Sequence, residues 1–319
     1  MVTGTDLTTD SGGGLKPALA QFAQAHVGAL LAARDVSWDH GESEVWALTA
    51  EGGRAVVKVH RQARKFRNER AAYTDWLPQL RPRLEPGTCV PELLAVHDEH
   101  PRALLLGLAE GEPLDARQTT PQLEAAVHER AGRFLRSLHG IDLHDADPMP
   151  LADAYELRLR AWIKRAAGIF PEAVTGAVSS ALAETLPFVA GQARVACHRD
   201  FTPRNWLVPL GDQPDWSPAA SAGERADGGV LTVIDFEHSQ PDLYLTDLLR
   251  LWVGAWRRRP DLRSSFLKGY GRSLTSAEEE ALRGLAAFWA FSTVVWASEH
   301  RDGAFERAGW KTLSWLGLV

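Results

Sequence analysis

One short segment of the chain places a possible base and a possible metal ligand at a fixed spacing. Residues 197–205 read CHRDFTPRN, so Asp200 and Asn205 stand five positions apart, just before an apolar run that begins at Trp206. A second apolar run ends in Asp235, thirty residues after Asn205. Carboxylate and amide oxygens are ligands that Mg²⁺ accepts, and a further carboxylate can take a proton.

Phosphoryl transfer from a nucleoside triphosphate uses this set of groups. Mg²⁺ bridges the triphosphate oxygens and takes one or two further oxygens from the protein, which we expect to come from Asn205 and Asp235. The transition state is loose, so the protein mainly positions the reactants and stabilises charge. Asp200 is expected to accept a hydrogen bond from the acceptor hydroxyl and to take its proton late, while His198 braces the loop.

A lysine within an apolar, strand-like run is a third signal. Lys58 lies in residues 55–59 (AVVKV), where burial of an unpaired ammonium is costly. Glu69, eleven residues later in a predicted helix, can reach back to it. We expect Lys58 to hold the α- and β-phosphates and Glu69 to hold Lys58. The alternatives are a lysine whose charge extends to solvent, and a surface ion pair between Glu69 and a neighbouring arginine.

The elements that would position these groups form a small sheet followed by a larger helical part. In the first part, apolar alternation and helical periodicity predict strands at 45–49, 54–60, 93–96 and 103–106, with helices over 15–33 and 64–77. Pro78 is expected to end the second helix. In the second part, helices are predicted at 120–139, 151–167 and 172–186 and again from 244 onward, with short strands at 194–196, 206–208 and 230–234. Residues 1–14 are predicted to be a disordered tail, and 209–229 a mobile hairpin insertion.

With these motifs in place, the chain resembles the aminoglycoside phosphotransferase family, whose fold is similar to that of eukaryotic-type protein kinases. The matching features run from about residue 45 to 251. The resemblance implies an α+β, bilobal, protein-kinase-like fold, with a small antiparallel-sheet N-lobe over 15–106 and a mainly helical C-lobe over 107–319. It also implies ATP or GTP as phosphate donor, bound with Mg²⁺ in the cleft between the lobes.

The resemblance extends to two further segments. Residues 104–114 (LLLGLAEGEPL) are similar to the family's interlobe hinge, which implies that backbone groups around Leu106 and Leu108 bind the edge of the nucleotide base. Residues 242–248 are similar to a family segment in which Asp247 would be structural and bond to the catalytic loop.

Two positions depart from the related patterns. Residues 39–44 (DHGESE) stand where the family has a Gly- and Ser-rich loop, and Ser43 is the candidate there for covering the phosphates. Glu237 stands where protein kinases have Gly after Asp-Phe, and it is a candidate for shaping a substrate or metal site.

The acceptor is expected to be a small polar molecule that carries a hydroxyl. The family resemblance and an excess of carboxylates over 110–190 favour an aminoglycoside or similar cationic natural product, with Glu299 and Asp302 as candidate acceptor ligands. A metabolite kinase for choline, homoserine, an amino sugar or a nucleoside-like compound stays open. So does a pseudokinase that binds nucleotide without turnover.

The tryptophans on the predicted C-terminal helices allow two interpretations. The chain has twelve tryptophans, among them Trp252, Trp256, Trp289 and Trp296. They could form an aromatic cage for a quaternary ammonium, but we expect them to fill the core of the C-lobe.

Composition excludes several other classes of protein. A formal charge of −6 and a pI near 6.0 argue against nucleic-acid binding, which needs a basic face. Two distant cysteines, Cys89 and Cys197, are too few for a disulfide framework and fit a cytoplasmic protein. The most apolar stretch, 284–297, is too short to span a bilayer and predicts a buried helix. We therefore expect no membrane partner, and a monomer or homodimer.

Overall fold

The computed structural model describes residues 14–37, 43–116, 118–143, 147–209 and 231–319. The predicted tail over 1–14 and the predicted insertion over 209–229 lie almost entirely outside these ranges. The chain forms two compact units. The first unit is Met1–Thr119 with Pro203–Ser239, and the second is Thr120–Thr202 with Gln240–Val319.

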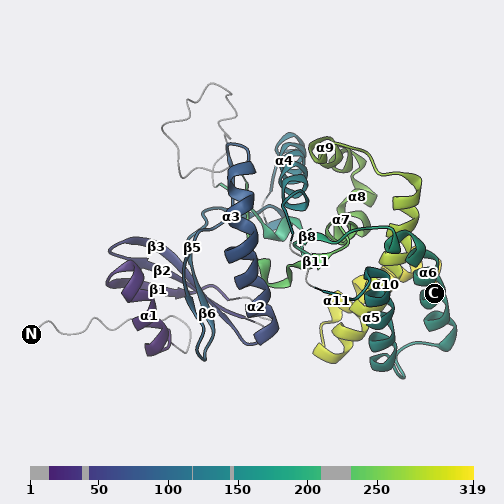
Figure 1. The fold of residues 1–319 in the computed structure, drawn as a ribbon, viewed down its shortest axis with the longest axis horizontal. Helices are drawn as coiled ribbons and strands as arrows, with labels where there is room; N and C mark the ends of the chain where they lie inside the picture. Colours follow the sequence, from purple (N-terminus) through teal and green to yellow (C-terminus); the bar gives the residue numbers. More distant parts are fainter. Residues whose placement is uncertain (1–13, 38–42, 117, 144–146, 210–230) are drawn as a thin grey trace, which may run out of the picture. The chain divides into compact units, whose positions relative to one another are not determined.

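The first unit is built on a five-stranded antiparallel sheet (Figure 1). In sheet order its strands are β1 (Leu30–Asp35), β2 (Ser43–Ala50), β3 (Gly53–His60), β6 (Ala103–Gly107) and β5 (Leu93–His97). The four predicted strands are confirmed, but the helix predicted over 15–33 is wrong in its second half. Helix α1 (Pro17–Val27) ends at Gly28, whose φ of 81° favours glycine, and the chain from Leu30 pairs with β2 instead.

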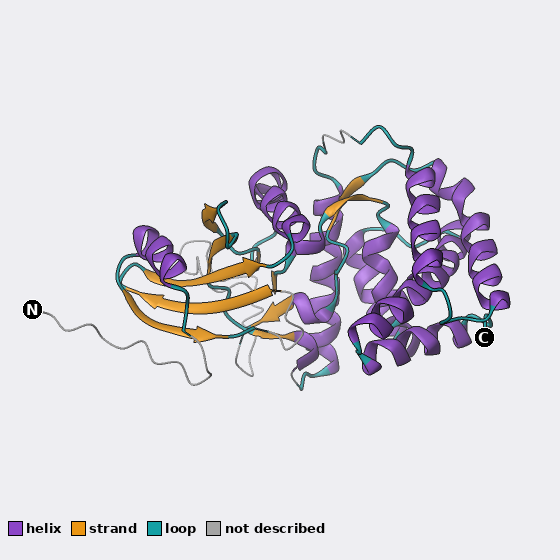
Figure 2. Ribbon diagram, turned by 90° about the horizontal axis from the view of Figure 1, so that it is seen from below, coloured by secondary structure: helices purple, strands orange, loops and turns teal. Residues whose placement is uncertain are grey.

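The two faces of this sheet have different partners. Figure 2 shows α1 lying along one face, where the buried core consists of Leu19, Ala23, Trp46, Leu48, Ala55, Val57, Val59, Ala103 and Leu105. Because side chains alternate along a strand, the odd-numbered residues of β3 enter this core and the even-numbered ones face the other side. Lys58 and His60 therefore point away from α1, toward α2 (Ala63–Ala71).

The helical path that begins with α2 continues beyond Pro78, which was expected to end it. A π-helical turn over Ala72–Trp76 leads into α3 (Leu77–Leu80), and a 3₁₀ turn follows at Arg81–Arg83. Pro78 lies in the first turn of α3, a position where a residue without an N–H is tolerated.

A second, four-stranded sheet joins residues 203–239 to the first unit. Its order is β4 (Thr88–Cys89), β10 (Leu231–Val233), β9 (Trp206–Val208) and β7 (Glu112–Pro113). Since β10 pairs with β4 and β9 pairs with β7, this part of the chain packs with the N-terminal residues. The compact units thus divide the chain differently from the predicted boundary after residue 106, which assigned this segment to the second lobe.

The second unit is mainly helical. Its helices are α4 (Pro121–His139), α5 (Leu151–Arg165), α6 (Glu172–Ala190), α7 (Leu245–Val253), α8 (Ala255–Arg258), α9 (Pro260–Tyr270), α10 (Ser276–His300) and α11 (Gly303–Trp315). A two-stranded sheet pairs β8 (Val195–Cys197) with β11 (Gln240–Asp242), and α4 and α9 pack side by side (Figure 1). Thr120 caps α4 as predicted, because its hydroxyl accepts the N–H of Leu123 at 3.2 Å.

Two helices of this unit, α6 and α10, have the length and apolar composition of a membrane span. Helix α10 is longer than the apolar stretch at 284–297 because it begins in a capping box between Thr275 and Glu278. Of its most apolar window, 72% is buried inside the structure, as expected of a core helix, whereas the figure for α6 is 28%.

Candidate active site

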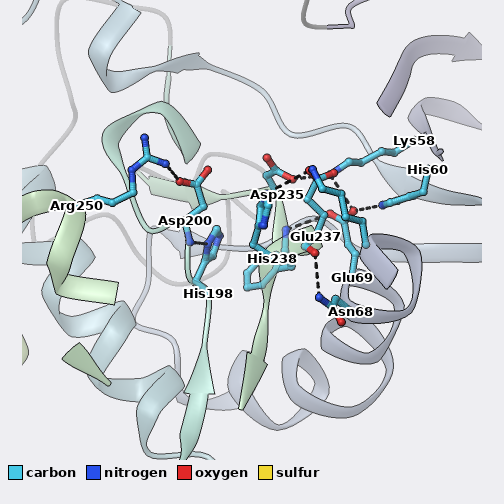
Figure 3. A network of polar contacts seen from close by, with 12 residues as sticks. Lys58, His60, Asn68, Glu69, His198, Asp200, Asp235, Glu237, His238 and Arg250 are labelled. Carbon is cyan, nitrogen blue, oxygen red and sulfur yellow. Dashed lines mark hydrogen bonds and ion pairs between the residues drawn. The ribbon is translucent and has the colours of Figure 1, made fainter. Parts of the chain in front are cut away.

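In the first unit, Lys58 stands among three carboxylates (Figure 3). Its Nζ lies 2.8 Å from Oε2 of Glu69, 2.5 Å from Oδ1 of Asp235 and 3.1 Å from Oε2 of Glu237. The exposed fraction of the Lys58 side chain is 9% and that of Glu69 is 1%. The expected ion pair between Lys58 and Glu69 is therefore present, and the lysine does not extend to solvent.

Burial and charge act in opposite directions on this cluster. Burial alone lowers the pKa of Lys58, but the carboxylates of Asp235, Glu69 and Glu237 outweigh it and hold that pKa well above its usual value. Burial raises the pKa of Glu69, but the Lys58 ammonium and a hydrogen bond from His60 lower it to about 2. Lys58 and Glu69 are thus both charged near neutral pH.

Two members of the cluster were missed in the sequence. His60 Nε2 lies 2.6 Å from Oε2 of Glu69, and Lys65 Nζ lies 2.7 Å from Oε1 of Glu237. The signal was available in both cases: His60 shares a strand face with Lys58, and Lys65 stands four residues before Glu69 on one helix face. Two ammonium groups therefore face three carboxylates.

One face of α2 holds the segment that follows β10. Lys65, Asn68 and Glu69 stand at i, i+3 and i+4, so their side chains point the same way. Lys65 pairs with the carboxylate of Glu237, Asn68 Nδ2 donates to its carbonyl at 3.3 Å, and Oε1 of Glu69 accepts the N–H of Phe236 at 3.1 Å. Glu237 therefore has partners on α2 and in Lys58, and its role at a substrate or metal site stays a prediction.

Strand pairing places the backbones of the two predicted metal ligands close together. Strands β9 and β10 are antiparallel, and the N–H of Ile234 donates to the carbonyl of Asn205 at 3.1 Å. Asp235 is the next residue, and it leaves the strand in a left-handed conformation with φ of 68°. Its side chain is 30% exposed, in a cluster with one carboxylate more than its ammonium groups. Oxygen donors and a net negative charge fit a hard cation such as Mg²⁺.

The structure describes the other three residues expected to contact the nucleotide, which are Ser43, Leu106 and Leu108. Ser43 is the first residue of β2, opposite His60, while the rest of its loop, residues 38–42, lies outside the described residues. Leu106 is buried within β6. The N–H of Leu108 donates to the carbonyl of Arg54 at 3.3 Å, which continues the pairing with β3. That donor has a partner in the sheet, and base binding by other backbone groups around Leu106 and Leu108 stays a prediction.

In the second unit, the carboxylate of Asp247 accepts hydrogen bonds from the loop that contains Asp200, the candidate base. Its carboxylate accepts the N–H of His198 at 3.0 Å and the N–H of Arg199 at 2.5 Å. His139 Nε2 lies 3.0 Å from the same carboxylate, and His139 Nδ1 lies 2.9 Å from the hydroxyl of Tyr270. The predicted structural role of Asp247 is confirmed.

A second buried carboxylate, Asp242, holds the side chain of the same loop. Its Oδ2 lies 3.0 Å from Nε of Arg199 and 2.9 Å from Nη1 of Arg158. Burial raises the pKa of Asp242, but the two guanidinium groups outweigh it, so the pKa lies below its usual value. Arg199 has φ of 65°, and these anchors compensate for that strained backbone.

We expect Asp247→Ala to lower the free energy of unfolding by about 3 kcal/mol or more. The change leaves one buried N–H group, of His198, and one half-buried N–H group, of Arg199, without their acceptor, at about 1–3 kcal/mol each. Denaturant titration of the variant measures this. Asp153→Ala, on the exposed side of α5, is the matched control and should change stability by less than about 0.5 kcal/mol. Equal stability of the two variants would contradict the anchoring role.

Asp200 itself has a cationic neighbour that sequence reasoning missed. The Oδ1 of Asp200 bonds to Nη1 of Arg250 on α7, and the N–H of Asp200 donates to Nδ1 of His198 at 3.3 Å (Figure 3). Arg250 stands three residues after Asp247, so helical spacing places both side chains on the face of α7 that meets the loop. The exposed fraction of the Asp200 side chain is 17%, which leaves it accessible in part.

The two carboxylates expected to bind a cationic acceptor have partners within the second unit. Glu299 is exposed and pairs with the guanidinium of Arg165. Asp302 caps α11, since its Oδ1 accepts the N–H groups of Ala304 and Phe305 at 3.1 and 2.9 Å. Both carboxylates therefore have structural uses that spacing in the sequence did not reveal.

The four tryptophans of the C-terminal helices differ in how far they are buried. Trp252 and Trp256 are buried, as the core interpretation predicts. Trp289 and Trp296 are half-buried, and both rings stand edge-on to Phe305, with centroids 6.2 and 5.7 Å away. These two rings therefore pack against Phe305 at the edge of the core rather than at its centre.

The chain was compared with curated proteins, with solved structures and with protein-family models. A search of curated proteins found no match. Similar solved structures include a gentamicin complex of APH(2″)-IIa, with a TM-score of 0.66 at 15% identity over 95% of this chain and 97% of that one. A GDP and kanamycin complex of APH(2″)-IIIa gives 0.70 at 12% over 95% and 99%. A complex of APH(4)-Ia with ADP and hygromycin B gives 0.64 at 14% over 94% and 98%.

These likenesses show the fold, a small antiparallel-sheet lobe and a helical lobe of the aminoglycoside phosphotransferase, kinase-like type. The model of the phosphotransferase enzyme family matches residues 33–285, which include the Lys58 cluster, the Asp200 loop, and Asn205 and Asp235 beside strands β9 and β10. The chain belongs to the phosphotransferase enzyme family.

Proposed function

We propose that this chain transfers the γ-phosphoryl group of ATP or GTP, bound with Mg²⁺, to a hydroxyl of a small molecule. The observation that carries the proposal is the ion pair of Lys58 with Glu69 and Asp235, beside the Asn205 carbonyl that accepts the N–H of Ile234. A buried lysine paired with carboxylates is a cation in a fixed position. Such a cation can bind the α- and β-phosphates. The nucleotide complexes among the similar structures support nucleotide binding.

The reaction assigns one role to each group. Asn205 and Asp235 would hold Mg²⁺, which neutralises charge on the phosphate oxygens. Asp200, held in its loop by Asp247, orients the acceptor hydroxyl. The acceptor oxygen bonds to the γ-phosphorus, the bond from that phosphorus to the β–γ bridging oxygen breaks, and the hydroxyl proton passes to Asp200. The products are a nucleoside diphosphate and a phosphate monoester.

The acceptor class is the finer part of the proposal. The similar structures are complexes with gentamicin, kanamycin and hygromycin B, which supports a small natural product as acceptor. At 12–15% identity this likeness shows the fold alone, and Glu299 and Asp302 have other partners. Aminoglycosides therefore enter the test as one group of acceptors among several. The two free cysteines, Cys89 and Cys197, support a reducing, cytoplasmic setting.

A mass-spectrometric acceptor screen tests the proposal. The purified protein is incubated with Mg²⁺ and ATP or GTP, together with aminoglycosides, choline, homoserine, amino sugars and nucleosides. We expect at least one acceptor to gain the mass of a phosphoryl group, and the product to disappear with Asp200→Ala. Tight binding of Mg²⁺–nucleotide without product or nucleotide hydrolysis would favour the pseudokinase alternative instead.

A further inference from the structure

Arg250 has more hydrogen-bonding capacity than its contact with Asp200 uses. A guanidinium carries five N–H donors in a planar fork, and Nη1 supplies one of them to Oδ1 of Asp200 (Figure 3). Over the described ranges of the chain, Asp200 is the only carboxylate within ion-pair distance of Arg250. The exposed fraction of the Arg250 side chain is 31%, so its remaining donors can reach a ligand that contacts Asp200.

One aromatic ring, that of Phe305, lies near this guanidinium. The Cζ of Arg250 lies 5.8 Å from the centre of the Phe305 ring. Phe305 in turn meets Trp289 and Trp296 edge-on, and all three rings are half-buried. A cation beside partly exposed aromatic rings suits a ligand that has both an anionic group and an apolar or aromatic part.

Several acidic side chains of the same helices already have partners. Glu279 pairs with Arg263 and accepts the indole N–H of Trp252 at 2.9 Å. Glu299 pairs with Arg165, and Asp302 caps α11. A polycationic acceptor needs carboxylates whose charge is not already compensated, and these three do not supply them.

We propose that Arg250 binds a carboxylate or phosphate ester of the acceptor, so that the acceptor is an anionic hydroxyl compound. The inference rests on the proposed function. One guanidinium would contact both Asp200 and the acceptor anion. This places the acceptor hydroxyl close to the carboxylate that takes its proton, and makes Arg250 a specificity-determining residue.

A matched pair of ligands tests the anion site directly. The probes are 4-(hydroxymethyl)benzoate and 4-(hydroxymethyl)benzamide, which share a ring and a hydroxyl and differ in charge. Binding to the protein with Mg²⁺–ADP is measured by ligand-observed NMR. A charged hydrogen bond contributes about 1.5–3 kcal/mol, so we expect the benzoate to bind about 10- to 100-fold more tightly. Arg250→Gln should abolish this preference and Arg250→Lys should restore part of it.

The control variant loses one positive charge as well, but at a different site. Arg257→Gln removes a cation that stacks on Trp315, 3.9 Å from the ring centre, and should leave the benzoate preference intact. Equal binding of the two probes, or of neither, to the wild-type protein would overturn the inference. So would a benzoate preference that survives in Arg250→Gln.

Steady-state kinetics distinguish binding of the acceptor anion by Arg250 from contact of Arg250 with the transferring phosphoryl group. With any acceptor found in the screen, loss of Arg250 should raise KM about 10- to 100-fold and change kcat less. A fall in kcat at constant KM would assign Arg250 to the phosphoryl group and overturn the acceptor inference, while the proposed function stands. The benzoate preference without turnover of any acceptor would refute the proposed function but keep the anion site.

Discussion

Asp200→Ala should lower kcat by about two to four orders of magnitude, the usual contribution of a positioned general base. The variant loses the carboxylate proposed to orient the acceptor hydroxyl, but it keeps the anchors of the loop on Asp247 and Asp242. The affinity for Mg²⁺–nucleotide should change little, because Lys58 and Asp235 belong to the other unit of the chain. Steady-state kinetics and a fluorescent-nucleotide titration measure the two quantities.

The control for Asp200→Ala is Asp153→Ala, an exposed carboxylate on α5 of the same unit, which should retain wild-type kcat. Circular dichroism establishes that both variants are folded. A folded Asp200→Ala protein with wild-type turnover would rule out the assigned role of Asp200 as base.

Asp235→Asn should weaken binding of Mg²⁺–nucleotide by about 100-fold or more. The change replaces the charged group proposed as a metal ligand by a neutral one, and even groups that only support metal ligands contribute about 10- to 100-fold to metal affinity. Asparagine is the suitable replacement because Asp235 has a positive φ, a conformation that asparagine tolerates better than alanine. Titration of the nucleotide with and without Mg²⁺ gives the metal-dependent part of the affinity.

The control is Asp98→Asn, an exposed carboxylate that pairs with Arg70 in the same unit. A surface pair of this kind contributes about 0–1 kcal/mol, and its loss should leave nucleotide affinity unchanged. If Asp235→Asn binds nucleotide with wild-type affinity and the same Mg²⁺ dependence, Asp235 is not a metal ligand.

Sequence reasoning located the groups that strand and helix periodicity can place. Lys58 and Glu69 could be paired in advance because one lies on a strand and the other on the helix that follows it. The role of Asp247 was also predictable, since its segment resembles one of known function in a family. In both cases the information lies within a short stretch of chain or a recognised motif.

The remaining features depend on contacts between residues distant in sequence. The partner of Asp200, Arg250, is fifty residues away, and no local pattern marks it. The helix predicted over 15–33 failed because the apolar residues from Leu30 onward fit a helix and a strand equally well, and pairing with β2 decides between them. Asp302 resembled a free acid because a helix cap is recognised only once the start of the helix is known.

The three bonds between α2 and the segment 235–237 have a consequence for small-molecule inhibitors of this chain. Some inhibitors gain affinity by occupying the space next to the lysine of a nucleotide site. To do so they must displace the helix whose glutamate pairs with that lysine. Here such a compound would break the contacts of Lys65, Asn68 and Glu69 together, two of them involving buried charges that would lose their partners. Compounds that fit the present arrangement of α2 are therefore the better starting point for design.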